Sequence, residues 1–342
     1  KSRLSATVTY VRNDSKDVFV NVPAPAVSGY QIVRTNPAYI GGNVLEVTLQ
    51  GAVLTNPNGL RWDILVTGDN QKQFTRRFGR TCFDDGLQYK CDGIPLSEMW
   101  GNQNVRDKSQ LAAIHRNSQA QFDVNDEGWV VPVGAGNTWR DGIAKNLWGS
   151  SVTIDGTAYG WGLPIQRRDS TGQLWYDRIG NSQPLFRFGF QNNFRYNNFR
   201  LFVQTTGQLG GDVYANSNQT FYASGDHPDV DQFGKPDELK KPVAYYNAVS
   251  NNNNLYLAQF VESGTHLTIA ELMLGYTADA KRWPFLDKVG VSRAQIDLIG
   301  RNMRTFTNYT GLNVMAGSPT VRFDDATYPM TRTLTGVVTL TF

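Results

Sequence analysis

The chain has 342 residues, long enough for one large hydrophobic core or two ordinary domains, and its net charge is only +3. Charged residues make up 18% of the chain, below the ~25% of an average soluble domain. Lys and Arg are scattered among acidic residues, so the sequence shows no obvious surface for nucleic acid. No run approaches the ~20 apolar residues of a transmembrane helix, which excludes a helical membrane protein but not a β-barrel, whose strands span only ~10 residues.

Segments of alternating apolar and polar residues recur along the chain, and helical periodicity is scarce. This pattern predicts nine β-strands. They cover Leu4 to Val11, Asp17 to Val22, Asn43 to Leu54, Leu60 to Thr75, Gln183 to Tyr196, Phe199 to Tyr214, Thr265 to Thr277, Val291 to Met303 and Arg332 to Phe342.

The predicted connections alternate between short and long. Tight polar turns are expected at Asn13 to Lys16, Asn56 to Gly59 and Asn197-Asn198. Long loops are expected at Pro23 to Gly42, Arg76 to Ser182, Ala215 to Gly264 and Arg304 to Thr331. The connection from Ala278 to Gly290 is intermediate in length and is expected to contain a short helical turn. Outer-membrane barrels show this alternation because their periplasmic turns are short and their extracellular loops are long.

Cys82 and Cys91 are the only cysteines, and they lie in a short polar segment from Thr81 to Gly93. An even pair at this spacing indicates a loop disulfide in an oxidising compartment. The alternative is a pair of reduced, unrelated thiols. Two cysteines and three dispersed histidines are too few ligands for a metal site, so we expect neither a metal nor a cofactor.

No group of residues indicates catalysis. The three histidines, His115, His227 and His266, stand in different contexts, and none has a nucleophile and an orienting group beside it. Aspartates between residues 226 and 237 lack the ordered spacing of a calcium loop, which favours a solvated loop. We therefore expect that the protein is not an enzyme.

Aromatic residues gather in the long loop before residue 182, outside any strand pattern. Flat rings beside amide and guanidinium groups are suited to stacking on sugars or holding peptides. The alternative is that the rings pack together in a small hydrophobic core of the loop. The candidate substrate-binding residues are Trp129, Trp139, Arg140, Trp148, Tyr159, Trp161 and Trp175.

The last predicted strand alternates apolar residues and ends on an aromatic residue. This pattern resembles the C-terminal signal that the barrel-assembly machinery reads in outer-membrane proteins. Its residues are Gly336, Val338, Leu340 and Phe342.

Several segments resemble, in the same order along the chain, the SusC/RagA family of TonB-dependent transporters. Pro184 to Phe190 and Asn193 to Phe199 resemble the family's strand, tight turn and return strand. Other matching segments are Asp17 to Val22, Gly207 to Tyr214, Leu272 to Thr277, Gly300 to Leu312 and Tyr328 to Thr333. Departures lie mostly in loops. Asn313-Val314-Met315 stands where the family usually has an Asp-Pro-Glu turn, and Arg76 to Ser182 aligns poorly, so no substrate can be carried over.

The resemblance implies an all-β fold, an antiparallel transmembrane β-barrel segment with about nine strands of a 22-stranded barrel and long extracellular loops. Residues 1–342 would then be the C-terminal part of one barrel domain, with the plug domain and the N-terminal barrel strands outside this chain. Because the family's last strand descends to the periplasm, nine strands would place Lys1 at the extracellular face. An open sheet edge in lipid leaves backbone groups without partners, so we expect the remaining N-terminal part of the transporter to complete the barrel.

The implied function is TonB-dependent import of an oligosaccharide, glycan or peptide across the outer membrane of a Gram-negative-type bacterium. The implied partners are a SusD-like surface lipoprotein, the TonB-ExbB-ExbD complex acting through the plug, and outer-membrane lipid. The alternatives are a β-rich surface or filament-forming protein and a small self-contained porin, neither with energised transport.

Overall fold

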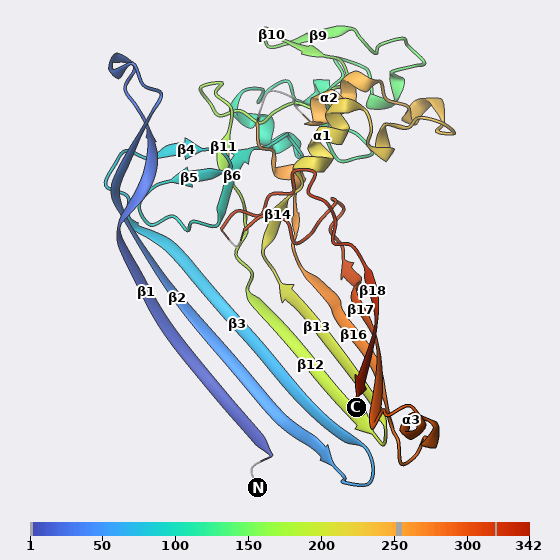
Figure 1. Cartoon of the computed structure of the whole chain (residues 1–342). Coiled ribbons are helices and arrows are strands. Elements are labelled where there is room, and N and C mark those ends of the chain that lie inside the picture. The colour runs from blue at the N-terminus through green and yellow to red at the C-terminus, as the bar shows by residue number, and fades with distance from the viewer. Residues whose placement is uncertain (1–2, 251–254, 319) are drawn as a thin grey trace.

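The computed structural model describes residues 3–250, 255–318 and 320–342. Its largest element is an eight-stranded antiparallel sheet, which forms a curved wall with β1 at one edge and β18 at the other (Figure 1). The strands in sheet order are β1 (Leu4–Pro23), β2 (Ile32–Thr55), β3 (Arg61–Arg77), β12 (Phe186–Tyr196), β13 (Phe199–Leu209), β16 (His266–Asp279), β17 (Arg293–Thr307) and β18 (Thr333–Thr341). The predicted antiparallel barrel segment is confirmed.

The two ends of the wall differ in their connections. At one end the strands are joined by residues 56–60, by Asn197-Asn198, and by a segment that contains α3 (Pro284–Lys288), the predicted short helical turn. At the other end lie residues 78–185, 210–265 and 308–332, together with the tip of the β1–β2 hairpin at η1 (Ala26–Ser28). The predicted alternation of short turns and long loops therefore holds from β2 onward.

The predicted turn from Asn13 to Lys16 is wrong. Asn13, Asp14 and Ser15 stay in β1 and pair with Gly42, Gly41 and Ile40 of β2, and an irregularity between Ser15 and Val18 includes Asp17 at a φ of 55°. The polar residues tolerate this bulge, and the Asp14 carboxylate accepts hydrogen bonds from Arg12 and Arg76. The first two predicted strands are thus one long strand, and most of the predicted loop from Pro23 to Gly42 is the β1–β2 hairpin.

The merged strand makes the count eight instead of nine, which corrects the predicted position of the chain start. Lys1 lies outside the described residues, but β1 begins at Leu4 beside Gly51, near the short β2–β3 turn. Figure 1 shows the start of β1 and the end of β18 toward the short-turn end of the wall. The first strand therefore ascends from the same side to which β18 descends.

One face of the wall is apolar. Strand register assigns residues to faces because successive side chains alternate. A row of paired residues crosses seven strands on this face and contains Leu54, Trp62, Phe194, Leu201, Leu274, Leu298 and Gly336. Near the short turns the same face carries ring pairs, Trp62 with Phe194 and Phe199 with Tyr276, as in the aromatic girdle of a barrel. A transmembrane barrel presents a face of this kind to lipid.

The opposite face is polar and carries ion pairs between side chains of different strands. Arg200 of β13 lies 2.8 Å from Asp297 of β17. Arg301 and Glu271 lie 2.9 Å apart on β17 and β16. These charged side chains would be costly in lipid and are accommodated on the side that faces a barrel lumen.

The described residues of three long segments, 78–185, 210–265 and 308–332, together form a packed unit that we call the cap. Its longer helices are α1 (Asn216–Ser224) and α2 (Val243–Ser250), and no helix in the described residues is long and apolar enough to cross a membrane. The remaining elements are β4 (Phe83–Asp85), β5 (Gln88–Lys90), β6 (Glu98–Asn102), η2 (Lys108–Ala113), η3 (Gln119–Gln121), β7 (Phe122–Val124), β8 (Val130–Pro132), η4 (Trp139–Asp141), β9 (Ser151–Ile154), β10 (Thr157–Gly160), β11 (Tyr176–Asn181), β14 (Asp212–Tyr214), η5 (Pro228–Val230), η6 (Asp237–Leu239), η7 (Ala258–Phe260) and β15 (Val261–Ser263).

The buried apolar residues belong almost entirely to the cap. In the described part of the chain, only Ala38, Leu286 and Val291 of these residues lie outside it. The largest cluster joins the first two cap segments, for example Trp161 with Tyr245 and Leu257, and partly buried Phe323 of the third segment packs against it. The cap therefore has a hydrophobic core of its own, which the sequence analysis gave as the alternative for the aromatic residues of the long loop.

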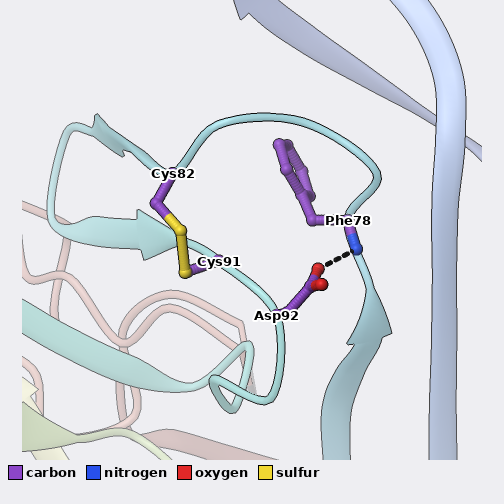
Figure 2. The surroundings of a disulfide bond; sticks show 4 residues. All are labelled: Phe78, Cys82, Cys91 and Asp92. Atoms are coloured by element: carbon purple, nitrogen blue, oxygen red, sulfur yellow. Dashed lines mark hydrogen bonds between the residues drawn. A yellow bond between two sulfur atoms is a disulfide. The ribbon is translucent and has the colours of Figure 1, made fainter.

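The predicted disulfide between Cys82 and Cys91 is confirmed (Figure 2). The two Cα atoms lie 4.6 Å apart and flank the β4–β5 hairpin. The Asp92 carboxylate accepts a hydrogen bond from the backbone N–H of Phe78. The crosslink therefore fixes the first turn of the cap where the chain leaves β3.

Candidate ligand cavity in the cap

Most of the candidate substrate-binding tryptophans are buried in the cap core. Trp129, Trp139 and Trp161 are only 5%, 9% and 2% exposed. The Trp148 ring packs edge-on against Trp161 at 5.0 Å, and the guanidinium of Arg106 lies 3.2 Å from the centre of the Trp129 ring. With their rings covered by protein, these four residues take the packing role that the sequence left open as the alternative.

The other three candidates are placed differently. Arg140 is exposed and lies 3.5 Å from Glu238. The half-buried Trp175 ring is covered on one face by the guanidinium of Arg167, 4.0 Å from the ring centre. Tyr159 lines a cavity and is the one aromatic candidate that the structure brings to a hollow surface.

This cavity has a volume of about 770 Å³, which lies in the range typical of small-ligand sites. It lies between the first cap segment and α2. The lining residues come from the ends of η2, from the β9–β10 hairpin, from residues 164–172 and from Ala248 of α2. The walls are therefore supplied by elements that the cap core holds together.

A chain of hydrogen bonds organises one wall of the cavity. Ser118 Oγ donates to Asp155 Oδ1 at 2.6 Å, and Asp155 Oδ2 lies 2.9 Å from Nδ1 of His115. His115 Nε2 lies 2.7 Å from the Tyr159 hydroxyl. When the Nδ1 proton points at the carboxylate, Nε2 accepts a hydrogen bond from the Tyr159 hydroxyl. These three hydrogen bonds fix the orientation of Tyr159 toward the cavity.

The electrostatics of this wall follow from the same contacts. Hydrogen bonds from Ser118 and then from His115 lower the pKa of Asp155. Burial raises the pKa of Tyr159, so its hydroxyl stays protonated at neutral pH. Ser118 is directed at Asp155 instead of His115, so the three residues do not form a nucleophile, base and orienting group in that order.

Buried amides lie close to the cavity. The side-chain nitrogen of Gln166, which lines the cavity, has no hydrogen-bond partner among the described residues. The backbone of Asn104 pairs with that of Gln166, and its side-chain nitrogen and oxygen also have no hydrogen-bond partner among the described residues. The same holds for the indole nitrogen of Trp175. Unsatisfied buried polar groups are rare and costly, and hydroxyl or amide groups of a ligand are suited to satisfy them.

The cavity thus combines an oriented phenol, buried amides, the Asp155 carboxylate and the Arg168 guanidinium. No group of His, Cys, Asp and Glu suited to a metal ion occurs in the described residues. Sequence reasoning missed Asp155, Gln166 and Arg168 because ordinary polar residues in a loop carry no signal until the fold brings them together. His115 and Asp155 are 40 positions apart.

Comparisons with known proteins agree with the fold. No family model matches the chain. A TonB-dependent receptor, P39, of Formosa agariphila is 22% identical over 346 residues, covering 93% of this chain and 31% of the receptor. A second receptor of that organism, P3, is 24% identical over 206 residues, covering 54% of this chain and 19% of its own length. The chain thus spans about a third or less of the curated relatives that it matches.

Solved structures of the RagAB peptide transporter share the fold. One structure, of the importer in its closed-closed state, has a TM-score of 0.64 at 16% identity and covers 99% of this chain and 34% of the other. Another has a TM-score of 0.65 at 15% identity, with coverage of 99% and 33%. The comparisons confirm the resemblance to SusC/RagA-type TonB-dependent transporters. The relatives that the chain matches are described as receptors and as a peptide importer.

Proposed function

We propose that this chain is part of the barrel wall and the extracellular cap of a TonB-dependent transporter that imports a nutrient across the outer membrane. The observation that carries the proposal is the combination of an apolar outer face, a polar inner face and a packed cap on one curved sheet. A filament or surface protein has no need of a lipid-covered face. The likeness to TonB-dependent receptors supports the same conclusion.

The remainder of the transporter is proposed to complete the barrel. In the described residues β1 pairs only with β2, and β18 only with β17. Open edges in lipid would leave backbone groups without partners. We therefore place the N-terminal strands of the same protein at these edges, and the plug, on which the TonB-ExbB-ExbD complex pulls, inside the barrel. Gly336, Val338, Leu340 and Phe342 are proposed to guide barrel assembly from the apolar face of β18.

The substrate is proposed to be an oligosaccharide, glycan or peptide that binds in the cap cavity. Tyr159 offers a ring and a hydroxyl, Gln166 an unpartnered amide, and Arg168 a charged donor. These groups suit a ligand rich in hydroxyl or amide groups.

A SusD-like lipoprotein is proposed to close over the cap. The tip of the β1–β2 hairpin exposes apolar side chains at the same end of the wall, with Val27 96% and Tyr30 71% exposed. Exposed apolar groups at a loop tip fit a protein contact better than solvent. Changing Val27 to Asp should weaken co-purification of the complete transporter with its lipoprotein, while Leu312→Asp, a control at a partly exposed cap residue, should not.

The transport proposal is tested in cells that carry the complete gene. Uptake of labelled oligosaccharide and peptide mixtures should fall when the gene is deleted and when the proton-motive force is collapsed. The transporter itself should show heat-modifiable migration on a denaturing gel, as a folded outer-membrane barrel does. Uptake that is unaffected by deletion, or a protein that forms filaments and does not fractionate with the outer membrane, would contradict the proposal.

The role of the cavity is tested by Tyr159→Ala combined with Gln166→Ala. We expect substrate affinity to fall about tenfold or more, because each change removes a contact worth roughly 1 kcal/mol. Tyr328→Ala, at a residue that is 94% exposed, is the matched control and should leave affinity unchanged. Equal affinity in the double variant would assign the substrate to another part of the transporter.

A further inference from the structure

A second cavity, of about 310 Å³, lies where the cap meets the polar face of the wall. Arg187 of β12, Gln208 of β13 and His266 of β16 pair in register and line it from the wall. Arg322 lines it from the cap, together with Met315 and Ser318. The cavity therefore stands on the inner face, between the cap and the lumen.

Arg322 is buried without a counter-charge. Its residue is 7% exposed, and its side chain donates to the Gln208 amide oxygen and to the Val314 carbonyl at 2.8 Å. Both partners are neutral, and the described residues place no carboxylate within ion-pair distance of it. A buried guanidinium normally has an acidic partner because removing its charge from water is costly.

Nearby acids are committed elsewhere. Asp69 lies 2.6 Å from Arg187. Asp324, two positions from Arg322, is fully buried but accepts hydrogen bonds from the Tyr309 hydroxyl at 2.8 Å and the Asn313 N–H at 3.0 Å. The described lining of the cavity contains three basic residues, Arg187, His266 and Arg322, and no acidic side chain.

The local field is consequently positive. Burial, and then the neighbouring charge of Arg187, lower the pKa of Arg322, although a guanidinium remains protonated at neutral pH. Further N–H groups of Arg322 have no partner among the described residues. A ligand with negative oxygens would supply both the missing charge and the missing acceptors.

We propose that this cavity binds one oxyanion group of the imported substrate, a carboxylate or a sulfate. The ligand's identity as cargo rests on the proposed transport function, whereas the anion site rests on Arg322 and its neutral surroundings. Guanidinium forms paired hydrogen bonds with such planar or tetrahedral oxyanions. The carboxylate can come from a peptide C-terminus or from an acidic sugar, and the sulfate from a sulfated sugar.

The test uses the complete transporter purified with its lipoprotein, and equilibrium binding of matched probes. The probes are a tetrapeptide with a free or an amidated C-terminus, a tetrauronate with free or methyl-esterified carboxyls, and a sulfated tetrasaccharide with its desulfated form. At least one charged probe should bind about tenfold more tightly than its neutral form, and the pair that does so identifies the source of the oxyanion.

Two variants locate the effect at this cavity. Arg322→Gln should abolish the preference for the charged probe. Thr206 lines the cavity from the wall. Thr206→Glu should also abolish the preference for the charged probe, because it supplies an internal carboxylate and leaves Arg322 in place. Arg178→Gln, at an exposed arginine paired with Glu98 in the cap, is the control and should keep the preference. Heat-modifiable migration reports that each variant is folded.

The proposal is overturned if no charged probe binds better than its neutral form, including the case in which no probe binds. It is also overturned if a folded Thr206→Glu or Arg322→Gln protein retains the full preference. Uptake in cells is measured separately. Deletion-sensitive uptake with unchanged charge preference would reject the anion site and leave the transport function standing.

Discussion

The wall and the cap are two parts of one chain that are stabilised in different ways. In the wall, backbone hydrogen bonds join neighbouring strands and many large apolar side chains remain exposed, such as Leu298 at 61% and Leu334 at 82%. In the cap, the apolar side chains are buried against each other, and Lys241 is enclosed between Asp126 and Glu127 at 2.7 and 3.1 Å. In the proposed transporter the wall therefore depends on lipid as its solvent, whereas the cap is stabilised by a buried core of its own.

The largest expected effect comes from a change in the cap core, which tests whether the cap unfolds separately from the wall. Trp161→Ala should destabilise the cap by about 3 to 5 kcal/mol because it leaves a cavity and removes the indole hydrogen bond to Val133. Limited proteolysis of the complete transporter should show faster cleavage in the cap, while heat-modifiable migration of the barrel stays unchanged. Trp283→Ala, at a ring 43% exposed beside the short turns, is the control. Loss of barrel migration in Trp161→Ala would show that cap and wall fold as one unit.

The reciprocal change charges the lipid face of the wall. Leu272 lies midway along β16 on the apolar face and pairs with Val203 and Gly300. Leu272→Arg should cost about 2 to 4 kcal/mol, as a cation does at the middle of a bilayer. Met273→Arg, one residue along and on the polar face, should cost much less. Refolding into vesicles with a urea titration measures both, and equal costs would contradict the assignment of faces.

The faces were predictable because alternation is a local property of the sequence. The rows through Leu201 and Leu274 follow from period-two patterning together with antiparallel pairing. The register of β1 was missed because Asn13 to Lys16 has the composition of a turn. In the folded protein this segment stays extended and is stabilised by an ion pair between residues far apart in the sequence, Asp14 and Arg76, at 2.9 Å.

The cap was not predictable in this way. Its core forms from residues far apart in the sequence, such as Trp161 with Tyr245, and neither residue lies in a periodic segment. A cluster of tryptophans in a loop was therefore equally compatible with binding and with packing. Burial separated the two, because only Tyr159 of the aromatic candidates lines the cavity. Arg322 gave no signal in the sequence, since its lack of an acidic partner is a property of the fold.

A smaller effect tests how the cap is anchored to the wall. Replacing Cys82 and Cys91 together by Ser should destabilise the segment between them by about 2 to 3 kcal/mol, because the crosslink no longer restricts the unfolded loop. Hydrogen exchange should increase in residues 81–93 and remain unchanged in β12 and β13. Increased exchange in those wall strands would instead make the crosslink part of the barrel's stability.

The smallest expected effect is a pH dependence confined to one wall of the cap cavity. Hydrogen bonds from Ser118 and His115 lower the pKa of Asp155 in the folded state, so the folded form prefers the carboxylate. A depressed pKa contributes stability above the ordinary Asp value of about 4, and this contribution is lost as the pH falls through the folded-state pKa. The difference in cap stability between wild type and Asp155→Asn should therefore be present at pH 7 and shrink below about pH 4.

Because Asp155 is partly exposed, solvent screens the interaction and the shift in unfolding temperature should be small. Tryptophan fluorescence of the complete transporter during heating at several pH values measures it, since Trp161 and its neighbours report on the cap core. Asp226→Asn, a cap aspartate away from the cavity lining, corrects for general acid effects. A difference that persists undiminished at pH 3 would mean that the variant acts through packing instead of charge. Packing of the cap residues around His115 would then orient Tyr159.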